Sequence, residues 1–108
     1  MNTNGIVKLQ TSMDQLDLED LKLATKVFRA INHPLRLNIV RLIEEHGRLS
    51  VTQIYFKLRI EQSVASQHLA ILRDSDVVTA SRDGKNIHYS INPSRLNAII
   101  RSIQTLRV

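Results

Sequence analysis

The chain of 108 residues contains no cysteine. Disulfide bonds, thiol-based redox sensing and metal binding through thiolates are therefore excluded. Aromatic residues are also scarce, with two tyrosines, two phenylalanines and no tryptophan. A surface that stacks single-stranded bases on aromatic rings is therefore not expected.

Long apolar runs are missing as well. No run approaches the length of a membrane span, and the amino-terminal segment lacks the basic and then apolar layout of a signal peptide. We therefore expect a cytoplasmic protein without a membrane partner. The length is that of one domain, and an apolar fraction of 43% is enough for a folded chain. The polar segment 1–15 is expected to be a mobile tail, and residues 16–108 are expected to form the domain.

Acidic residues are fewer than basic ones, 10 against 15, which gives a net charge of +5. Four of the acids lie within the first 20 residues, so the rest of the chain holds 14 basic and six acidic residues. Such an excess favours a polyanionic partner, and nucleic acid is the commonest one for a protein of this kind. Charge alone does not exclude a membrane surface.

The segment 62–73 has the periodicity of an α-helix with one polar side. At 100° per residue, Ala65, Leu69 and Leu72 share a face that is expected to pack against a core. The opposite face carries amides, which match adenine edges, and hydroxyls, which match phosphates or either base type. Its residues are Gln62, Ser63, Ser66, Gln67, Ala70 and Arg73. An ordinary solvent-facing helix, the alternative, is normally richer in Lys and Glu.

The segment 77–91 predicts a β-hairpin. Apolar residues alternate with polar ones on both sides of Asp83-Gly84, a pair that tolerates the positive φ angles of a tight turn. Arg82 and Lys85 flank the tip, where they can reach phosphates or a minor groove. Basic residues also keep edge strands soluble, so this interpretation depends on the preceding helix. Together the helix and the hairpin predict a winged helix-turn-helix fold with double-stranded DNA as its partner.

Three further helices are predicted before residue 62 and one after the hairpin. Apolar residues recur at helical spacing in each, and proline or serine marks where several of them begin. The fold class is therefore mainly α with a two-stranded β wing, in the order α-α-α-α-β-β-α. The additional helices are expected at 18–31, from Pro34 to Gly47, from Ser50 as cap through Leu58, and from Pro93 onward.

The first and last helices carry more apolar surface than a winged core of three helices needs. Pairing with a second copy of the chain would bury this surface. The alternative is that both helices simply cover the core of their own chain. The candidate dimer residues are Leu18, Leu21, Phe28, Leu96, Ile99, Ile100 and Ile103.

At these residues the chain resembles the ArsR/SmtB family of bacterial dimeric winged-helix repressors, from about residue 18 to 106. The segment 30–39 is similar to the start of the family's second helix. Ser66-Gln67-His68-Leu69 with Leu72-Arg73 is similar to its recognition-helix signature, and Tyr89 matches its second wing strand. The resemblance implies a homodimeric repressor on an inverted-repeat operator. It also implies that Gln62, Ser63, Ser66 and Gln67 enter the major groove.

The positions of the family's metal ligands hold other residues in this chain. Ser50 and Thr52 stand where arsenic-type members carry thiolates, and neither can replace a thiolate. Pro93 and Arg95 stand at the early positions of the zinc site in the last helix, and Leu106 stands at a late one. We therefore expect no metal at these sites and no other cofactor.

Asp76 is a further departure, because the family commonly has glycine after the recognition helix. Aspartate adopts the left-handed conformation more easily than most residues, so the turn is expected to persist.

Histidine is the remaining candidate for metal binding. A metal site needs three or four convergent ligands, and none of the histidines has a second ligand three or four residues away. A structural histidine is therefore expected at each position, with clustering between two protomers as the alternative. The four residues are His33, His46, His68 and His88.

Catalysis has little support in the sequence. Ser66 and His68 point in different directions on one helix, and no carboxylate pair or glycine-rich phosphate loop is present. We therefore predict a DNA-binding transcriptional regulator rather than an enzyme. A winged-helix module that binds an acidic protein partner is the alternative. The sequence does not identify an effector. The alternatives are a small organic molecule, a metal at an unfamiliar site, and no effector.

Overall fold

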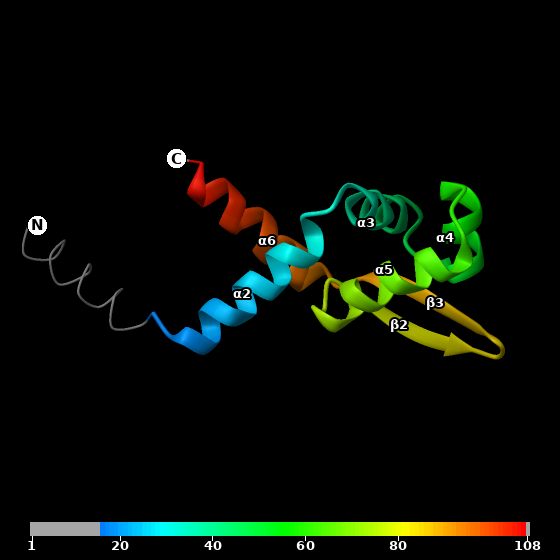
Figure 1. Cartoon of the computed structure of the whole chain (residues 1–108), viewed down its shortest axis with the longest axis horizontal. Helices are drawn as coiled ribbons and strands as arrows, with labels where there is room; N and C mark the ends of the chain where they lie inside the picture. Colours follow the sequence, from blue (N-terminus) through cyan, green and yellow to red (C-terminus); the bar gives the residue numbers. More distant parts are fainter. Residues whose placement is uncertain (1–15, 108) are drawn as a thin grey trace, which may run out of the picture.

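The computed structural model describes residues 16–107, so segment 1–15, expected to be a mobile tail, lies outside the described residues. The fold is mainly α with a β wing, as the sequence predicts (Figure 1). Its elements are α2 (Leu18–Ile31), α3 (Pro34–His46), β1 (Leu49–Ser50), α4 (Val51–Leu58), α5 (Gln62–Asp74), β2 (Val78–Asp83), β3 (Asn86–Ile91) and α6 (Pro93–Leu106).

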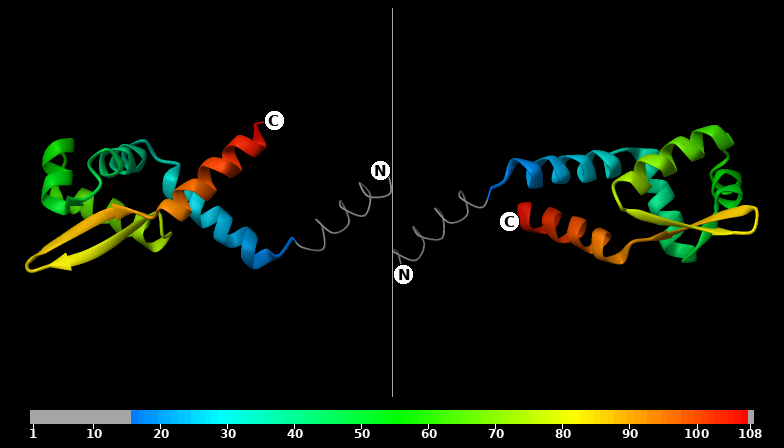
Figure 2. Two further views of the ribbon diagram at one scale, coloured as in Figure 1. Left: turned by 180° about the vertical axis from the view of Figure 1, so that it is seen from behind. Right: turned by 90° about the horizontal axis from the view of Figure 1, so that it is seen from below.

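The elements form two groups at opposite ends of the molecule. Helices α3, α4 and α5 gather with the sheet at one end, and the tip of the β2–β3 hairpin projects there (Figure 1). Helices α2 and α6 cross one another and both extend toward the other end (Figure 1 and Figure 2). In the described part of the chain, no helix is long and apolar enough to span a membrane.

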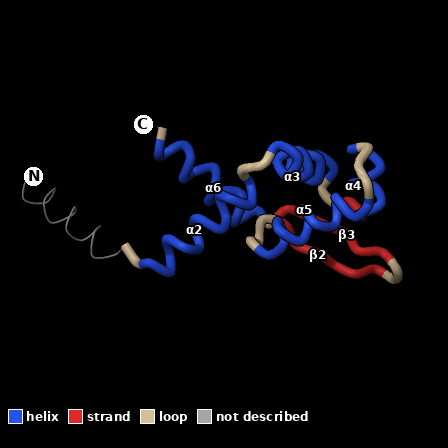
Figure 3. The backbone as a smooth tube through the Cα atoms, in the orientation of Figure 1, coloured by secondary structure: helices blue, strands red, loops and turns tan. Residues whose placement is uncertain are grey.

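The sheet has three antiparallel strands in the order β1-β3-β2 (Figure 3). Strands β2 and β3 form the predicted wing, with Val78 opposite Ile91. Strand β1 was not predicted, so the expected order of elements is corrected at this point. It has only two residues, and it exists because Leu49 pairs with Tyr89 of β3. Such a contact leaves no alternating pattern within the strand itself.

Side-chain caps explain where several helices begin. The Ser50 hydroxyl accepts from the Gln53 amide at 3.1 Å, while the Gln53 side chain accepts from the Ser50 amide at 2.9 Å, which forms a capping box for α4. Asn92 caps α6 in a similar way, with Pro93 as the first helical residue. The predicted third helix and its Ser50 cap are therefore confirmed.

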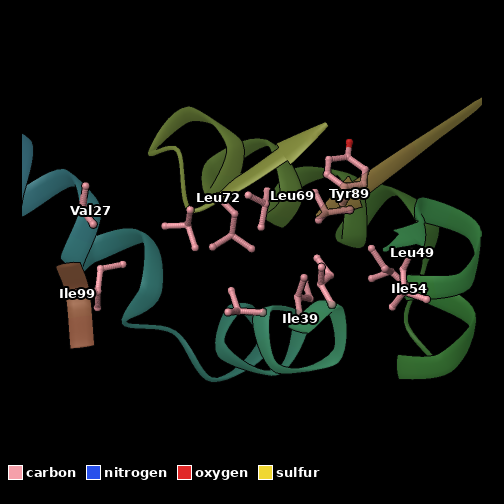
Figure 4. Packing of buried hydrophobic residues seen from close by; sticks show 12 residues of the cluster. Val27, Ile39, Leu49, Ile54, Leu69, Leu72, Tyr89 and Ile99 are labelled. Carbon is pink, nitrogen blue, oxygen red and sulfur yellow. The ribbon is translucent and has the colours of Figure 1, made fainter. Parts of the chain in front are cut away.

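The core lies between α3, α5 and the sheet. Leu69 and Leu72 of α5 are fully buried and point toward Ile39 of α3 (Figure 4). Val27 and Ile99 lie together beyond this group, where α2 meets α6 (Figure 4). Because each core side chain is enclosed, truncating one leucine here to alanine costs about 2–5 kcal/mol. The apolar face predicted for residues 62–73 is therefore the inner face of α5.

Candidate nucleic-acid interface

The outer face of α5 is polar and accessible. All six residues predicted for the polar side are exposed, whereas Ala65, Leu69 and Leu72 are buried. The helix therefore has the orientation that its 100° periodicity predicts. The exposed residues are Gln62, Ser63, Ser66, Gln67, Ala70 and Arg73.

Helices α4 and α5 and the turn between them form a helix-turn-helix. Arg59 ends α4 in the left-handed conformation with φ 56°, and the Ile60 amide donates to the Tyr55 carbonyl at 3.1 Å. Glu61 precedes α5 without forming a side-chain cap. The amide N–H groups of the first turn of α5 are therefore available to an external acceptor such as a phosphate.

Basic side chains flank the tip of the wing. Gly84 adopts φ 62° in the turn, and Arg82 and Lys85 on either side of it are exposed. Arg48 was not singled out from the sequence, yet its guanidinium lies 3.9 Å from the Asp83 carboxylate near the same tip. These two residues are far apart in the chain, so no local pattern indicates the pair.

A depression joins α5 to the wing. Its walls include Ser66, Ala70 and Arg73 from the outer face of α5 and Tyr89 from β3. Arg73 therefore lies between the helix and the sheet and not at an isolated helix end. Asp74 and Asp76 complete its walls, so the polar face of α5 continues as far as Tyr89 of β3.

The opposite end of the molecule carries exposed apolar side chains. Leu18 is 62% exposed, Leu21 49%, and Ile100 and Ile103 43% each. Phe28 and Leu96 are half-buried. Ile99 differs from the other candidate dimer residues, because it is 4% exposed and already packed within the protomer. Its burial leaves little of the side chain for a partner.

A small cavity of about 180 Å³ lies between side chains of α2 and α6. Val27, Phe28 and Ile99 contribute apolar walls, and Asp20 and Arg95 contribute charges of opposite sign. Typical sites for drug-sized ligands occupy roughly 300–1,000 Å³, so this cavity is smaller than such sites.

Two residues at positions that the family resemblance matches to metal ligands make other contacts in this structure. The Ser50 hydroxyl is used as a helix cap, and Arg95 is held 3.7 Å from Asp76 as a cation. Within residues 16–107, no group of three or more His, Asp or Glu residues is arranged to hold a metal ion.

Two of the four histidines are neighbours in space. The rings of His33 and His68 lie 4.8 Å apart, between the start of α3 and the middle of α5. Burial lowers the pKa of His68, and the nearby His33 and Arg36 lower it further. The sequence did not predict this pair, because each histidine is surrounded by an ordinary helical pattern.

The chain has a helix-turn-helix, a wing with basic residues at its tip and an excess of basic residues. These features are those of a winged helix-turn-helix transcriptional regulator. The chain belongs to the arsR family of bacterial regulatory proteins, whose model matches residues 33–80. It is therefore a transcriptional regulator and not an enzyme.

Relatives match over most of the chain. The transcriptional repressor PagR of Bacillus anthracis is 35% identical over 95 residues, which are 88% of this chain and 92% of that protein. The HTH-type transcriptional regulator YgaV of Escherichia coli strain K12 is 30% identical over 101 residues, or 94% of each chain. The crystal structure of PagR superposes with a TM-score of 0.68 at 36% identity, covering 81% of this chain and 99% of that chain.

Proposed function

We propose that this regulator is a cytoplasmic homodimer that represses transcription by binding an inverted-repeat operator. One observation carries the proposal: along residues 62–73 the outer face of α5 presents amides, hydroxyls, Ala70 and one arginine but no acidic residue, next to a wing tipped with basic residues. Amides and hydroxyls recognise base edges, and cations bind phosphates, so the two parts of this surface have different tasks.

The proposed contacts follow from this division. Helix α5 enters the major groove, which is wide enough for an α-helix, and presents Gln62, Ser63, Ser66 and Gln67 to the bases. Arg73 contacts the backbone from the depression beside β3. Arg82 and Lys85 contact phosphates beside the neighbouring groove.

The proposed dimer forms through α2 and α6. Both helices extend away from the wing (Figure 1), and both carry exposed apolar residues. A two-fold pairing of these helices would bury those residues and place two copies of α5 on one face of the dimer. Such symmetry matches an inverted repeat, because each half-site is read by one protomer.

Regulation is proposed to be independent of the family's thiolate and last-helix metal sites. Ser50, Thr52, Pro93, Arg95 and Leu106 stand at those positions, and none of them is a ligand of the required type.

A footprint on the promoter region of the protein's own operon tests the proposal. We expect protection of two half-sites related by two-fold symmetry, together with salt-sensitive and weaker binding to random duplex. Binding to no DNA at all, with retention of an acidic protein partner, would instead favour the interaction module.

A further inference from the structure

Arg36 lies where three helices meet. From its place near the start of α3, its Nε donates to the Ala30 carbonyl at 2.6 Å, and its Nη2 donates to the Arg29 carbonyl at 3.1 Å. Both acceptors belong to the last turn of α2. The remaining terminal nitrogen, Nη1, is 3.1 Å from Nδ1 of His68 on α5. One side chain therefore connects α2, α3 and α5.

The end of α2 depends on these bonds. The last four carbonyls of a helix have no partner within it. The Phe28 and Ile31 carbonyls accept from the amides of Asn32 and His33, each at 2.9 Å. The other two are the Arg29 and Ala30 carbonyls that Arg36 satisfies. A guanidinium suits this position, since its planar donors reach several acceptors at once and its charge opposes the helix dipole.

The contact with Arg36 determines which ring nitrogen of His68 carries the proton. A guanidinium can only donate, so Nδ1 of His68 accepts and the ring proton lies on Nε2. Protonation of Nδ1 would remove the acceptor and place a second cation against Arg36. His33 is arranged in the same way, because its Nδ1 accepts from the Leu35 amide at 3.1 Å.

We propose that Arg36 is a positioning residue for operator recognition, which sets the angle between α2 and the recognition helix α5 through its bond to neutral His68. This inference rests on the proposed function, in which α2 forms the dimer and α5 reads the bases. The two copies of α5 must meet half-sites about one helical turn, roughly 34 Å, apart. A change in the α2–α5 angle within each protomer changes that separation.

The charges around His68 make this bond sensitive to acid. Arg36 and His33 face it from α3 and from the cap of α3, and both oppose its protonation. Lys26 of α2 is paired with Asp74 further along α5, at 3.0 Å. Within residues 16–107 no carboxylate forms an ion pair with His68. Besides α2 and α3, the elements packed against α5 are α4 and β2. Their charged residues, Lys57 of α4 and Arg82 and Asp83 of β2, are exposed.

The angle can be measured without DNA. Because the chain has no cysteine, spin labels can be attached at Lys22→Cys and Ala70→Cys, two exposed positions on α2 and α5. Labelled protein is diluted with unlabelled protein so that pulsed electron paramagnetic resonance reports distances within one protomer. We expect a narrow distribution in the wild type at neutral pH and a broad one in Arg36→Lys, whose single ammonium cannot replace the guanidinium fork.

Acid and matched variants complete the experiment. Lowering the pH to about 5 should broaden the wild-type distribution, since histidine charges in this range. His68→Asn should stay narrow, because its Oδ1 replaces Nδ1 as acceptor and does not titrate. Lys26→Met, which breaks the exposed ion pair between α2 and α5, should also stay narrow. Equal widths in the wild type and Arg36→Lys, and no change with acid, would overturn the proposal. If Arg36→Lys does not fold, the proposal is tested by comparing the widths of the distance distributions of wild type and His68→Asn at about pH 5.

Binding to operators whose half-site spacing is changed by one base pair tests whether the α2–α5 angle affects operator recognition. We expect Arg36→Lys to lose about tenfold in affinity for the natural spacing and to discriminate less against the altered ones. Its binding to random duplex should not change. A wild type with no preference for an inverted repeat would contradict the proposed function, while the spin-label distances would still decide the role of Arg36.

Discussion

Asp76 and Arg95 form an ion pair, with 3.7 Å between carboxylate and guanidinium, that joins the turn after α5 to the first turn of α6. Asp76 adopts φ 60°, as the sequence predicted for this position. The left-handed conformation costs most residues about 1–2 kcal/mol, and glycine avoids that cost. The ion pair is largely exposed on the carboxylate side and contributes little in return.

We therefore expect Asp76→Gly to have a free energy of unfolding at least equal to that of the wild type. Asp76→Val should lose roughly 1–2 kcal/mol, because a β-branched residue tolerates positive φ poorly. Urea unfolding of both variants measures the difference. A glycine variant less stable than the valine variant would mean that this turn does not adopt the left-handed conformation.

Gln62→Ala and Gln67→Ala should weaken binding to the cognate operator by about 1–3 kcal/mol, the size expected when a bidentate hydrogen bond to a base is removed. Binding to scrambled duplex should change little, because phosphates provide most of that affinity. Titration of both duplexes measures the loss of specificity, with Asn38→Ala on the exposed side of α3 as control. Wild-type affinity of both glutamine variants for the cognate site would show that α5 does not read bases there.

Arg82→Ala and Lys85→Ala should weaken cognate and scrambled duplex alike, since binding to phosphates does not depend on sequence. The slope of log affinity against log salt should fall by roughly one unit for each phosphate that the variant no longer neutralises. Arg41→Ala removes the same charge from an exposed position on α3 and serves as the control. An unchanged slope in both wing variants would contradict phosphate binding by the wing.

Ile100→Glu combined with Ile103→Glu should produce monomers, because both side chains are exposed and the proposed interface would have to bury their charges. Operator affinity should fall together with dimerisation. Thr105→Glu, at an exposed position on another face of the same helix, should remain dimeric. Analytical ultracentrifugation at micromolar concentration measures the change, and a monomeric wild type would contradict the dimer.

Acid should destabilise the fold through His68. Its pKa in the native state is lowered from 6.5 by burial and then by His33 and Arg36, so the unfolded chain binds its proton more readily. The free energy of unfolding should therefore be unaffected by this group well above pH 6.5 and decrease as the pH falls below that value. Urea unfolding of wild type and His68→Asn over about pH 5 to 8 measures this contribution. Parallel pH profiles of the two proteins would contradict it.

Local chemistry determined much of this protein. The 100° periodicity of residues 62–73 indicated the outer and inner faces of α5, and Asp83-Gly84 indicated the hairpin. Ser50 and Pro93 marked helix starts, since capping and the missing proline N–H act within one turn. These interactions join residues that are close in sequence, so the sequence alone specified the surface that we assign to DNA.

Tertiary structure decided what depends on contacts between distant segments. Strand β1 exists only because Leu49 meets Tyr89, and Ile99 is buried beside Val27 where α6 meets α2. The bond from Arg36 to His68 forms only when α3 and α5 lie against one another. Loop closure and packing bring such groups together, and no pattern along the chain records the result.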